Sequence, residues 1–166
     1  MSRLQQARDQ ILFARRYTLN LLEDIDTADW FKMPKGSVSH VGWQVGHLAM
    51  AQYRLCMERI RGNRPEDAEL ISEHFLKIFG KESVPEPDAG YYPDAVNIRR
   101  VFDRVHKQLM DELSQMDEAE LDAPVLKPHK LIKTKHWALI WCSHHEFLHA
   151  GQIGLLRRMM GAPPIW

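Results

Sequence analysis

The stretch from Trp137 to Met160 constrains this chain more than any other, because it is predicted to form one long helix with two histidines at its centre. Residues 144–149 read HHEFLH, and residues four apart on a helix lie on one face, one turn apart. His145 and His149 can therefore direct two imidazole rings at one point. This spacing is typical of a metal site, and it predicts that the helix supplies two of the ligands.

Both histidines are expected on the side of this helix that faces the core. The apolar residues that flank the pair are Trp141, Leu148, Leu155 and Leu156. A buried polar ring without a hydrogen-bond partner costs about one to a few kcal/mol, so two such rings need something to satisfy them. A metal ion shared with a further ligand would satisfy all the rings together.

Three other segments carry apolar residues at helical spacing and are predicted as long helices. They cover Leu4–Asp24, Ser39–Arg61 and Asp94–Met116, and a shorter helix is predicted over Glu66–Lys81. Side-chain oxygens that accept from the free N–H groups of a first turn mark helix starts, and glycine commonly follows a helix end. The expected caps are Ser37 or Ser39, Asp94 and Thr134, and the expected terminal glycines are Gly62 and Gly161.

The segments between these helices contain turn residues. Trp30 and Phe31 are expected to cover one end of the core, and three prolines with a glycine exclude regular structure from residues 83–93. Four long amphipathic helices and no predicted strand indicate an all-α protein, a four-helix bundle with the short helix between the second and third long helices. Residues 1–166 are predicted to form this single domain, with Ile165 and Trp166 docked back onto it.

The second long helix offers a third ligand. Trp43, His47, Arg54 and Glu58 fall along one stripe of this helix, on a partly apolar and partly polar face. His47 would complete a group of three with the pair on the C-terminal helix. Three neutral imidazoles and no carboxylate leave a divalent ion with open coordination positions, which is the arrangement of a catalytic rather than a structural site.

Other polar residues near these histidines are candidates for supporting roles. Gln152 shares the face of His149 and can hydrogen-bond a ligand ring, a metal-bound water or a substrate. Arg54 and Glu58 either form a half-buried ion pair or contact substrate, and Glu58 is also the candidate general base. Cys142 is predicted as a packed core thiol.

The remaining histidines are not expected in the primary group. His106 borders the apolar stripe of the helix over Asp94–Met116 and is a reserve ligand. His144 lies about a hundred degrees round the helix from His145, so it pairs poorly with His149. The histidines expected to be structural or solvent-facing are His40, His74, His129 and His136.

Charge and cysteine content narrow the function classes. The chain has 22 Lys and Arg against 22 Asp and Glu, and a nucleic-acid binder normally needs a basic excess to neutralise phosphates. We therefore expect no nucleic-acid partner. Two cysteines are too few for a disulfide framework, the N-terminus does not resemble a signal peptide, and no apolar run approaches membrane-spanning length. These features predict a cytoplasmic protein that does not bind membranes.

The motifs around the three histidines resemble those of the DinB-like family, a superfamily of metalloenzymes. The resemblance rests on Trp43-Gln-Val-Gly-His47-Leu-Ala, on His145-Glu-Phe-Leu-His149-Ala-Gly-Gln152 and on the ending Leu-Leu-Arg-Arg-Met-Met-Gly-Ala-Pro-Pro. It implies a bundle of up-down-down-up topology with the metal triad on His47, His145 and His149. Family members with known activity are transferases and isomerases that use a small thiol, and many form homodimers.

The sequence supports one leading hypothesis for the function and several alternatives. The leading hypothesis is a metal-dependent S-transferase that uses a low-molecular-weight thiol and a zinc, nickel or iron ion. The alternatives are a metal-dependent hydrolase, or a bundle that binds a metal or small ligand without catalysis. A metal-free interaction protein, whose histidine rings would face apart, is a further reading. The expected partners are a small-molecule substrate and a second copy of the chain.

Overall fold

The computed structural model describes residues 2–127 and 129–165, and within these ranges all the named elements are helices. The four long ones are α1 (Arg3–Leu22), α2 (Val41–Tyr53), α5 (Ala95–Leu113) and α6 (Lys135–Met159). The only pairing of β type in the described part is an isolated bridge between Pro124 and Thr134. The predicted all-α class is confirmed. Trp166 lies outside the described residues, so its docking stays a prediction.

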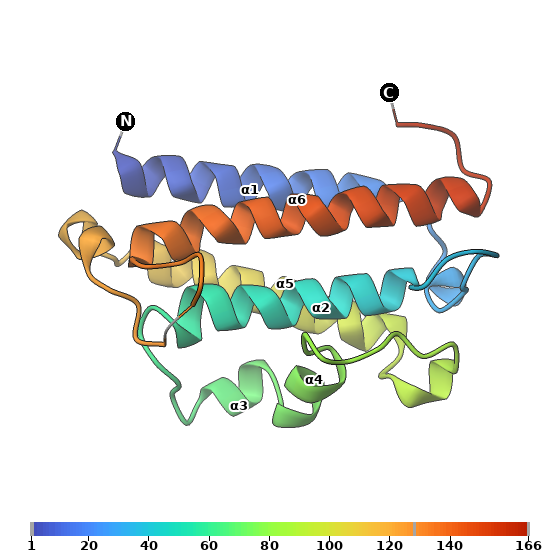
Figure 1. The fold of residues 1–166 in the computed structure, drawn as a ribbon, viewed down its shortest axis with the longest axis horizontal. Helices are drawn as coiled ribbons and strands as arrows, with labels where there is room; N and C mark the ends of the chain where they lie inside the picture. The colour runs from blue at the N-terminus through green and yellow to red at the C-terminus, as the bar shows by residue number, and fades with distance from the viewer. Residues whose placement is uncertain (1, 128, 166) are drawn as a thin grey trace.

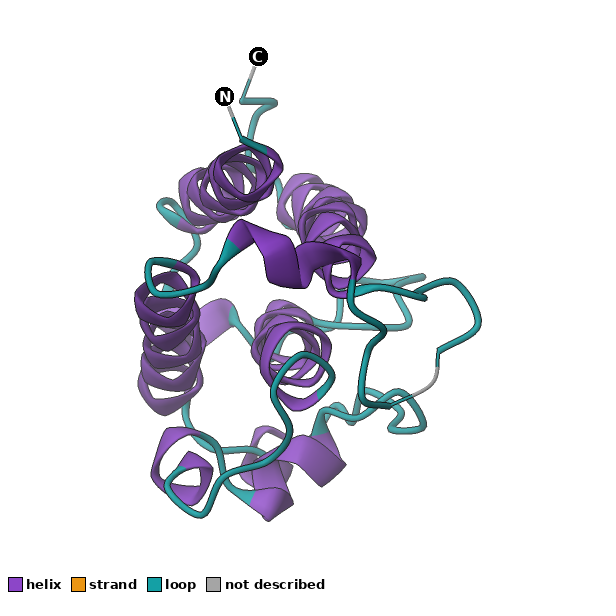
Figure 2. Ribbon diagram, turned by 90° about the vertical axis from the view of Figure 1, so that its left-hand side faces the viewer, coloured by secondary structure: helices purple, strands orange, loops and turns teal. Residues whose placement is uncertain are grey.

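The four long helices lie side by side. In Figure 1, α1 and α6 run from left to right, whereas α2 and α5 run from right to left. Helix α1 packs on α6, α2 packs on both α5 and α6, and Figure 2 shows the four helices nearly end-on. The core between them is apolar, with Ile11, Phe102, Leu139 and Ile153 almost completely buried. This packing brings the middle of α2 against the middle of α6.

The short elements cover the outer side of α2 and α5. Helix α3 (Asp67–Leu70) contacts α5, and α4 (Glu73–Ile78) contacts α2. The prediction of a single helix over Glu66–Lys81 was wrong. Ile71 adopts an extended conformation, and the Ser72 hydroxyl caps the new helix by accepting from Phe75 N. Three 3₁₀ segments lie in the remaining loops, η1 (Thr27–Asp29), η3 (Ala89–Tyr91) and η4 (Glu118–Asp122).

The helix starts agree with the predicted caps in two cases and differ in one. Asp94 and Thr134 accept from the backbone N–H groups of Asn97 and Trp137, as predicted. The cap of α2 is His40 instead of Ser37 or Ser39. Its Nδ1 accepts from Trp43 N at 3.1 Å, while its Nε2 donates to the Glu86 carbonyl at 3.1 Å. Histidine can cap here because the fully buried ring is held as one neutral tautomer.

The second long helix is not α-helical to Arg61. It continues as a π-helical segment, η2 (Arg54–Glu58), in which Arg59 N donates to Arg54 O at 3.2 Å. An i→i−5 turn holds more residues than the 3.6 of an α-helix, so it rotates the residues after Arg54 off the predicted stripe. Gly62, which was predicted as the terminal glycine, follows with φ of 84°, in the left-handed region.

Only some of the apolar residues that flank the histidine pair are buried. Leu156 is in the core, but Leu148 and Leu155 are 58 % and 57 % exposed. The expectation that all four flanking residues face the core was therefore wrong. The histidines lie at the boundary between the buried side of α6 and an exposed apolar stripe.

Candidate metal centre

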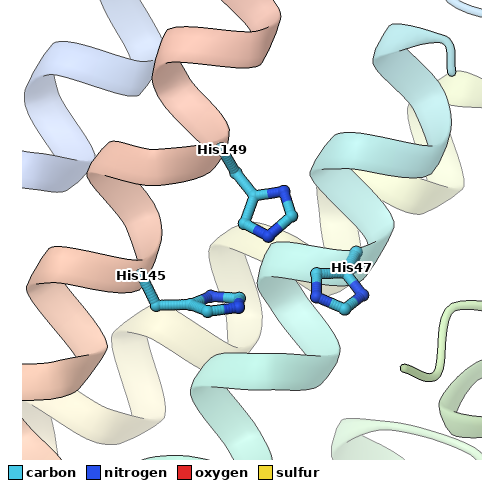
Figure 3. A group of neighbouring side chains, drawn as sticks. All are labelled: His47, His145 and His149. Carbon is cyan, nitrogen blue, oxygen red and sulfur yellow. The ribbon is translucent and has the colours of Figure 1, made fainter. Parts of the chain in front are cut away.

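Three histidine rings converge between α2 and α6. His47 comes from α2, and His145 and His149 come from successive turns of α6 (Figure 3). Each ring offers a nitrogen, and these nitrogens all lie within 4.8 Å of one another. Nitrogens bound to one tetrahedral ion at about 2.1 Å are about 3.4 Å apart, so small side-chain rotations would bring all three to one ion. The three residues predicted as ligands are those that the fold brings together.

His47 is fixed by the backbone of the α4 end. Its Nδ1 donates to the Phe79 carbonyl at 2.9 Å, which leaves Nε2 as the free nitrogen with a lone pair. Phe79 can lie so close to α2 because residue 46 is glycine. A Cβ at Gly46 would be 2.4 Å from the Phe79 ring, well inside van der Waals contact. The missing side chain thus allows the backbone contact that selects the tautomer of His47.

His149 is fixed by a chain of amides. Its Nδ1 donates to Oε1 of Gln44 at 2.5 Å, and the Gln44 amide donates to Oε1 of Gln152 at 2.9 Å and to the Ser39 hydroxyl at 2.8 Å. Such second partners orient a metal-binding ring and choose which nitrogen is free. Nε2 of His149 is therefore the nitrogen left for an ion.

The indole of Trp43 covers one side of the group. Its ring stacks on the His47 ring, with centroids 4.6 Å apart and planes 17° from parallel. The indole N–H donates to the Ser83 hydroxyl at 3.0 Å, in the loop that follows α4. The side chain that lies beside the histidines is thereby tied to that loop.

All three rings are held in the neutral form that a metal ion requires. Burial is the main cause in each case, and it lowers the pKa of His145 to about 4 and that of His149 to about 3. Burial also lowers the pKa of His47, against the opposing effect of the Phe79 carbonyl. His47 and His149 are 7 % and 9 % exposed, whereas His145 is half-buried, so the group opens toward solvent on the His145 side.

Comparison with known proteins identifies the family. The model of the DinB superfamily matches residues 10–153, a range that contains all three histidines and all four long helices in whole or in part. The chain belongs to the DinB superfamily. This superfamily is metal-binding, and the three-histidine group of this member is its candidate metal centre. A search of curated proteins found no significant match.

The family match is shorter than the resemblance suggested. Residues 154–166 lie beyond it, so none of the C-terminal sequence that resembled the family's ending is part of the match. In this DinB-superfamily protein, none of the helices in the described ranges is long and apolar enough to cross a bilayer.

The other predicted site residues lie in different places. Gln152 contacts Gln44, so it reaches His149 through that amide. Glu58 forms an ion pair with Lys127 at 2.6 Å, and the predicted pairing of Glu58 with Arg54 is replaced by this one. Glu58 lies at the end of the π-helical segment that follows α2, where the Lys127 ammonium contacts it.

The remaining histidine and cysteine candidates lie outside the triad. His144 is exposed, and His106 lies 3.4 Å from the Gln52 amide in a separate polar cluster. Cys142 is a buried free thiol, as predicted. Of the four histidines expected in peripheral roles, His40 is buried, His74 is exposed and the other two are half-buried.

Sequence reasoning missed two groups of residues. The first is Gln44, which precedes His47 by three residues and so projects from nearly the same face, a signal that could have been used. The second is a buried ion pair between Arg15 and Glu146, 2.8 Å apart. Glu146 lies inside the histidine motif, yet its partner is on another helix, and only the fold brings the two together.

Proposed function

We propose that this protein is a metal-dependent enzyme whose divalent ion is held by His47, His145 and His149 in an up-down-down-up four-helix bundle. The observation that carries the proposal is the convergence of three neutral ring nitrogens. The described residues add no carboxylate to the group, and it opens on the His145 side. Zinc, nickel and iron all accept imidazole ligands, so the donor set fits each of them. An ion held by three side chains keeps room for a substrate atom.

The reaction we propose is S-transfer from a small thiol to an electrophilic carbon. When bound, a divalent ion lowers the pKa of a coordinated thiol or water, so it supplies a thiolate or hydroxide near neutral pH. The thiolate sulfur forms the new C–S bond, the leaving group departs with its electron pair, and the thiol proton passes to solvent. The protein's part is to orient His47 and His149 through Phe79 and Gln44 and to exclude water with Trp43.

Two residues were predicted to act on the substrate directly. For Gln152 we propose a positioning role, because its contact with the group runs through Gln44. Glu58 would have to release Lys127 before it could accept a proton. A Glu58→Gln variant tests its assignment as general base, which requires a loss of kcat above pH 6 with unchanged metal content.

Turnover measurements separate S-transfer from hydrolysis. The zinc-, nickel- or iron-loaded protein is offered 1-chloro-2,4-dinitrobenzene with a panel of small thiols, and a p-nitrophenyl ester without thiol. We expect thiol-dependent arylation that is lost in His47→Ala and retained in His144→Ala, which changes an exposed histidine of the same helix. Ester hydrolysis alone would favour the hydrolase alternative. A stoichiometric metal with no turnover of either substrate would favour a binding protein.

We further infer that two copies pair through the exposed apolar stripe of α6. Trp137 and Met159 lie eleven residues before and after Leu148, and all three are exposed. An antiparallel pair of α6 helices crossing at Leu148 would set Trp137 against Met159 of the other copy. Such a stripe is self-complementary, as a two-fold interface requires. Phe13 of α1 is exposed as well, and its ring lies 5.9 Å from that of Phe147, the residue before Leu148.

Light scattering tests this pairing. We expect a dimer for the natural chain and a monomer for Leu148→Glu, because a charge at the centre of an apolar interface has no partner there. Val96→Glu, which changes an exposed residue of α5, should stay dimeric. A monomeric natural chain would refute the proposal.

A cytoplasmic location and a small-molecule substrate complete the proposal. Cys56 and Cys142 are both buried free thiols, which suits a reducing compartment. The balanced charge favours small substrates over nucleic acid.

A further inference from the structure

A groove of about 730 Å³ lies on the outer side of α2, between α4, the loop after it and Arg54. Five charged side chains line it, Arg54, Glu73, Lys77, Lys81 and Glu82, together with Ser83 and Tyr91. Cations outnumber carboxylates among these residues. The groove has room for a small organic molecule, and its lining favours one with negative charge.

The groove adjoins the histidine group through two shared elements. Ser83 lines the groove and accepts the hydrogen bond of Trp43, whose ring stacks on His47. Gly80 also lines it and follows Phe79, whose carbonyl holds His47. Trp43 and His47 of α2 and Arg54, the first residue after α2, lie on one stripe, so Arg54 is on the same face as His47, about two turns further along.

Arg54 is the cation best placed to bind that ligand. Arg54 is half-buried, and within residues 2–127 and 129–165 it forms no ion pair or hydrogen bond through its side chain. Arg15 and Arg61, by contrast, are both paired with carboxylates of the protein. An unpaired, half-buried guanidinium facing a groove is a site for an external anion.

We infer that this groove binds the carboxylate of the thiol co-substrate, with Arg54 as the specificity-determining residue and Lys77 and Lys81 at the rim. Guanidinium binds carboxylate through two parallel hydrogen bonds, which would fix the thiol with its sulfur toward the histidines. This inference rests on the proposed function for the sulfur and deepens it, since it names the class of thiol. It predicts that small thiols bearing a carboxylate are preferred over neutral or cationic ones.

Cobalt-loaded protein allows a direct test, because a thiolate bound to Co²⁺ gives a charge-transfer absorption. Titrations compare 3-mercaptopropionate with 2-mercaptoethanol and cysteamine, which carry negative, neutral and positive groups. We expect 3-mercaptopropionate to bind about tenfold more tightly than 2-mercaptoethanol, the effect of one charge-assisted contact. Arg54→Gln should abolish this preference and leave the affinity for 2-mercaptoethanol and the cobalt content unchanged. Arg54→Lys should restore part of it.

Lys107→Gln is the matched control, since it removes one positive charge from the exposed side of α5, outside the groove, and should keep the full preference. Equal affinity for the three thiols, or a preference that survives in Arg54→Gln, would overturn the inference.

Calorimetry with succinate on the same cobalt-loaded proteins gives a second readout that needs no thiol. If no thiol changes the cobalt spectrum, thiol chemistry fails. Succinate binding that Arg54→Gln weakens would still support the anion groove, and equal or absent binding would refute it.

Discussion

Two polar clusters lie among the same long helices and share α6, and they are built in opposite ways. In the first, Arg15 and Glu146 form a buried ion pair at 2.8 Å, and the Arg15 guanidinium also donates to the Phe102 carbonyl and to Gln52. The guanidinium lies 3.4 Å above the Phe102 ring. Each charge in this cluster is matched by groups of the protein itself.

In the second cluster, the histidine triad, only the outer nitrogens of two rings have protein partners. Those partners are Phe79 and Gln44, and among the described residues the nitrogens that face one another have no partner except the rings themselves. Three neutral acceptors that converge repel one another unless a cation lies between them. The comparison teaches that a buried polar cluster that is satisfied internally serves the fold, whereas one left open on its inner side is built for a ligand.

The largest expected effect is on the closed cluster. Glu146→Ala leaves the Arg15 charge buried without a partner, so we expect the free energy of unfolding to fall by about 3–5 kcal/mol. Urea denaturation of the metal-free protein measures it. The double variant Arg15→Met with Glu146→Leu should recover most of the loss, because it removes both charges. Asp122→Asn, which breaks an exposed pair with Arg3, should leave stability unchanged. If Glu146→Ala had the same free energy of unfolding as the natural chain, the proposed distinction between the two clusters would be wrong.

The opposite pattern is expected for the open cluster. His47→Ala removes a ligand, so zinc affinity should fall by more than the roughly 100-fold seen when outer partners are removed. The metal-free variant should also lose about 1–3 kcal/mol of stability, less than Glu146→Ala, because the Phe79 carbonyl loses its donor and Trp43 loses the ring that it stacks on. Competition with a chelator measures the affinity. If zinc affinity were unchanged, His47 would not be a ligand.

A smaller effect is expected for the residue that orients His149. Gln44→Ala should weaken zinc binding by about 10-fold to 100-fold, because the imidazole loses the acceptor that fixes its tautomer. Gln44→Glu keeps an acceptor at the same place and should retain the affinity. Gln152→Ala should have a weaker effect, because Gln152 is one hydrogen bond further from His149 than Gln44 is. If Gln152→Ala had a larger effect than Gln44→Ala, the series of hydrogen bonds from His149 through Gln44 to Gln152 would be contradicted.

The smallest effect concerns pH. The folded-state pKa of His145 is about 4 and its unfolded value is about 6.5, so between these values the unfolded chain binds a proton that the native protein does not. Stability therefore falls as pH falls through this window. Between pH 6 and pH 5, metal-free His145→Gln should lose about 1 kcal/mol less than the natural chain. Equal losses in the two proteins would show that His145 is not buried in the neutral form.

The long helices and the triad could be predicted because both follow from spacing along the chain. Apolar positions at a period of 3.6 define α1, α5 and α6, and the four-residue separation of His145 and His149 fixes their common face. His47 followed from the same argument on α2. Such features depend on the geometry of one helix at a time, which the sequence states directly.

The rest depends on contacts between elements. The acceptor of His47 is a backbone carbonyl, which leaves no trace in the identity of residue 79. Arg15 and Glu146 meet only after α1 packs on α6. The exposure of Leu148 likewise follows from which neighbours surround α6, since an apolar residue on a helix can face either a core or a partner. The π turn at Arg54 has no residue signature of its own.

Metal content tests the central claim most directly. Protein purified without chelator is analysed for zinc, nickel and iron, and the metal-free form is then titrated with zinc. We predict close to one divalent ion per chain as isolated, one saturable zinc site on titration, and the loss of both in the variant with His47, His145 and His149 all changed to alanine. No metal in the isolated protein together with no zinc binding, or an equal uptake by the triple variant, would contradict the account.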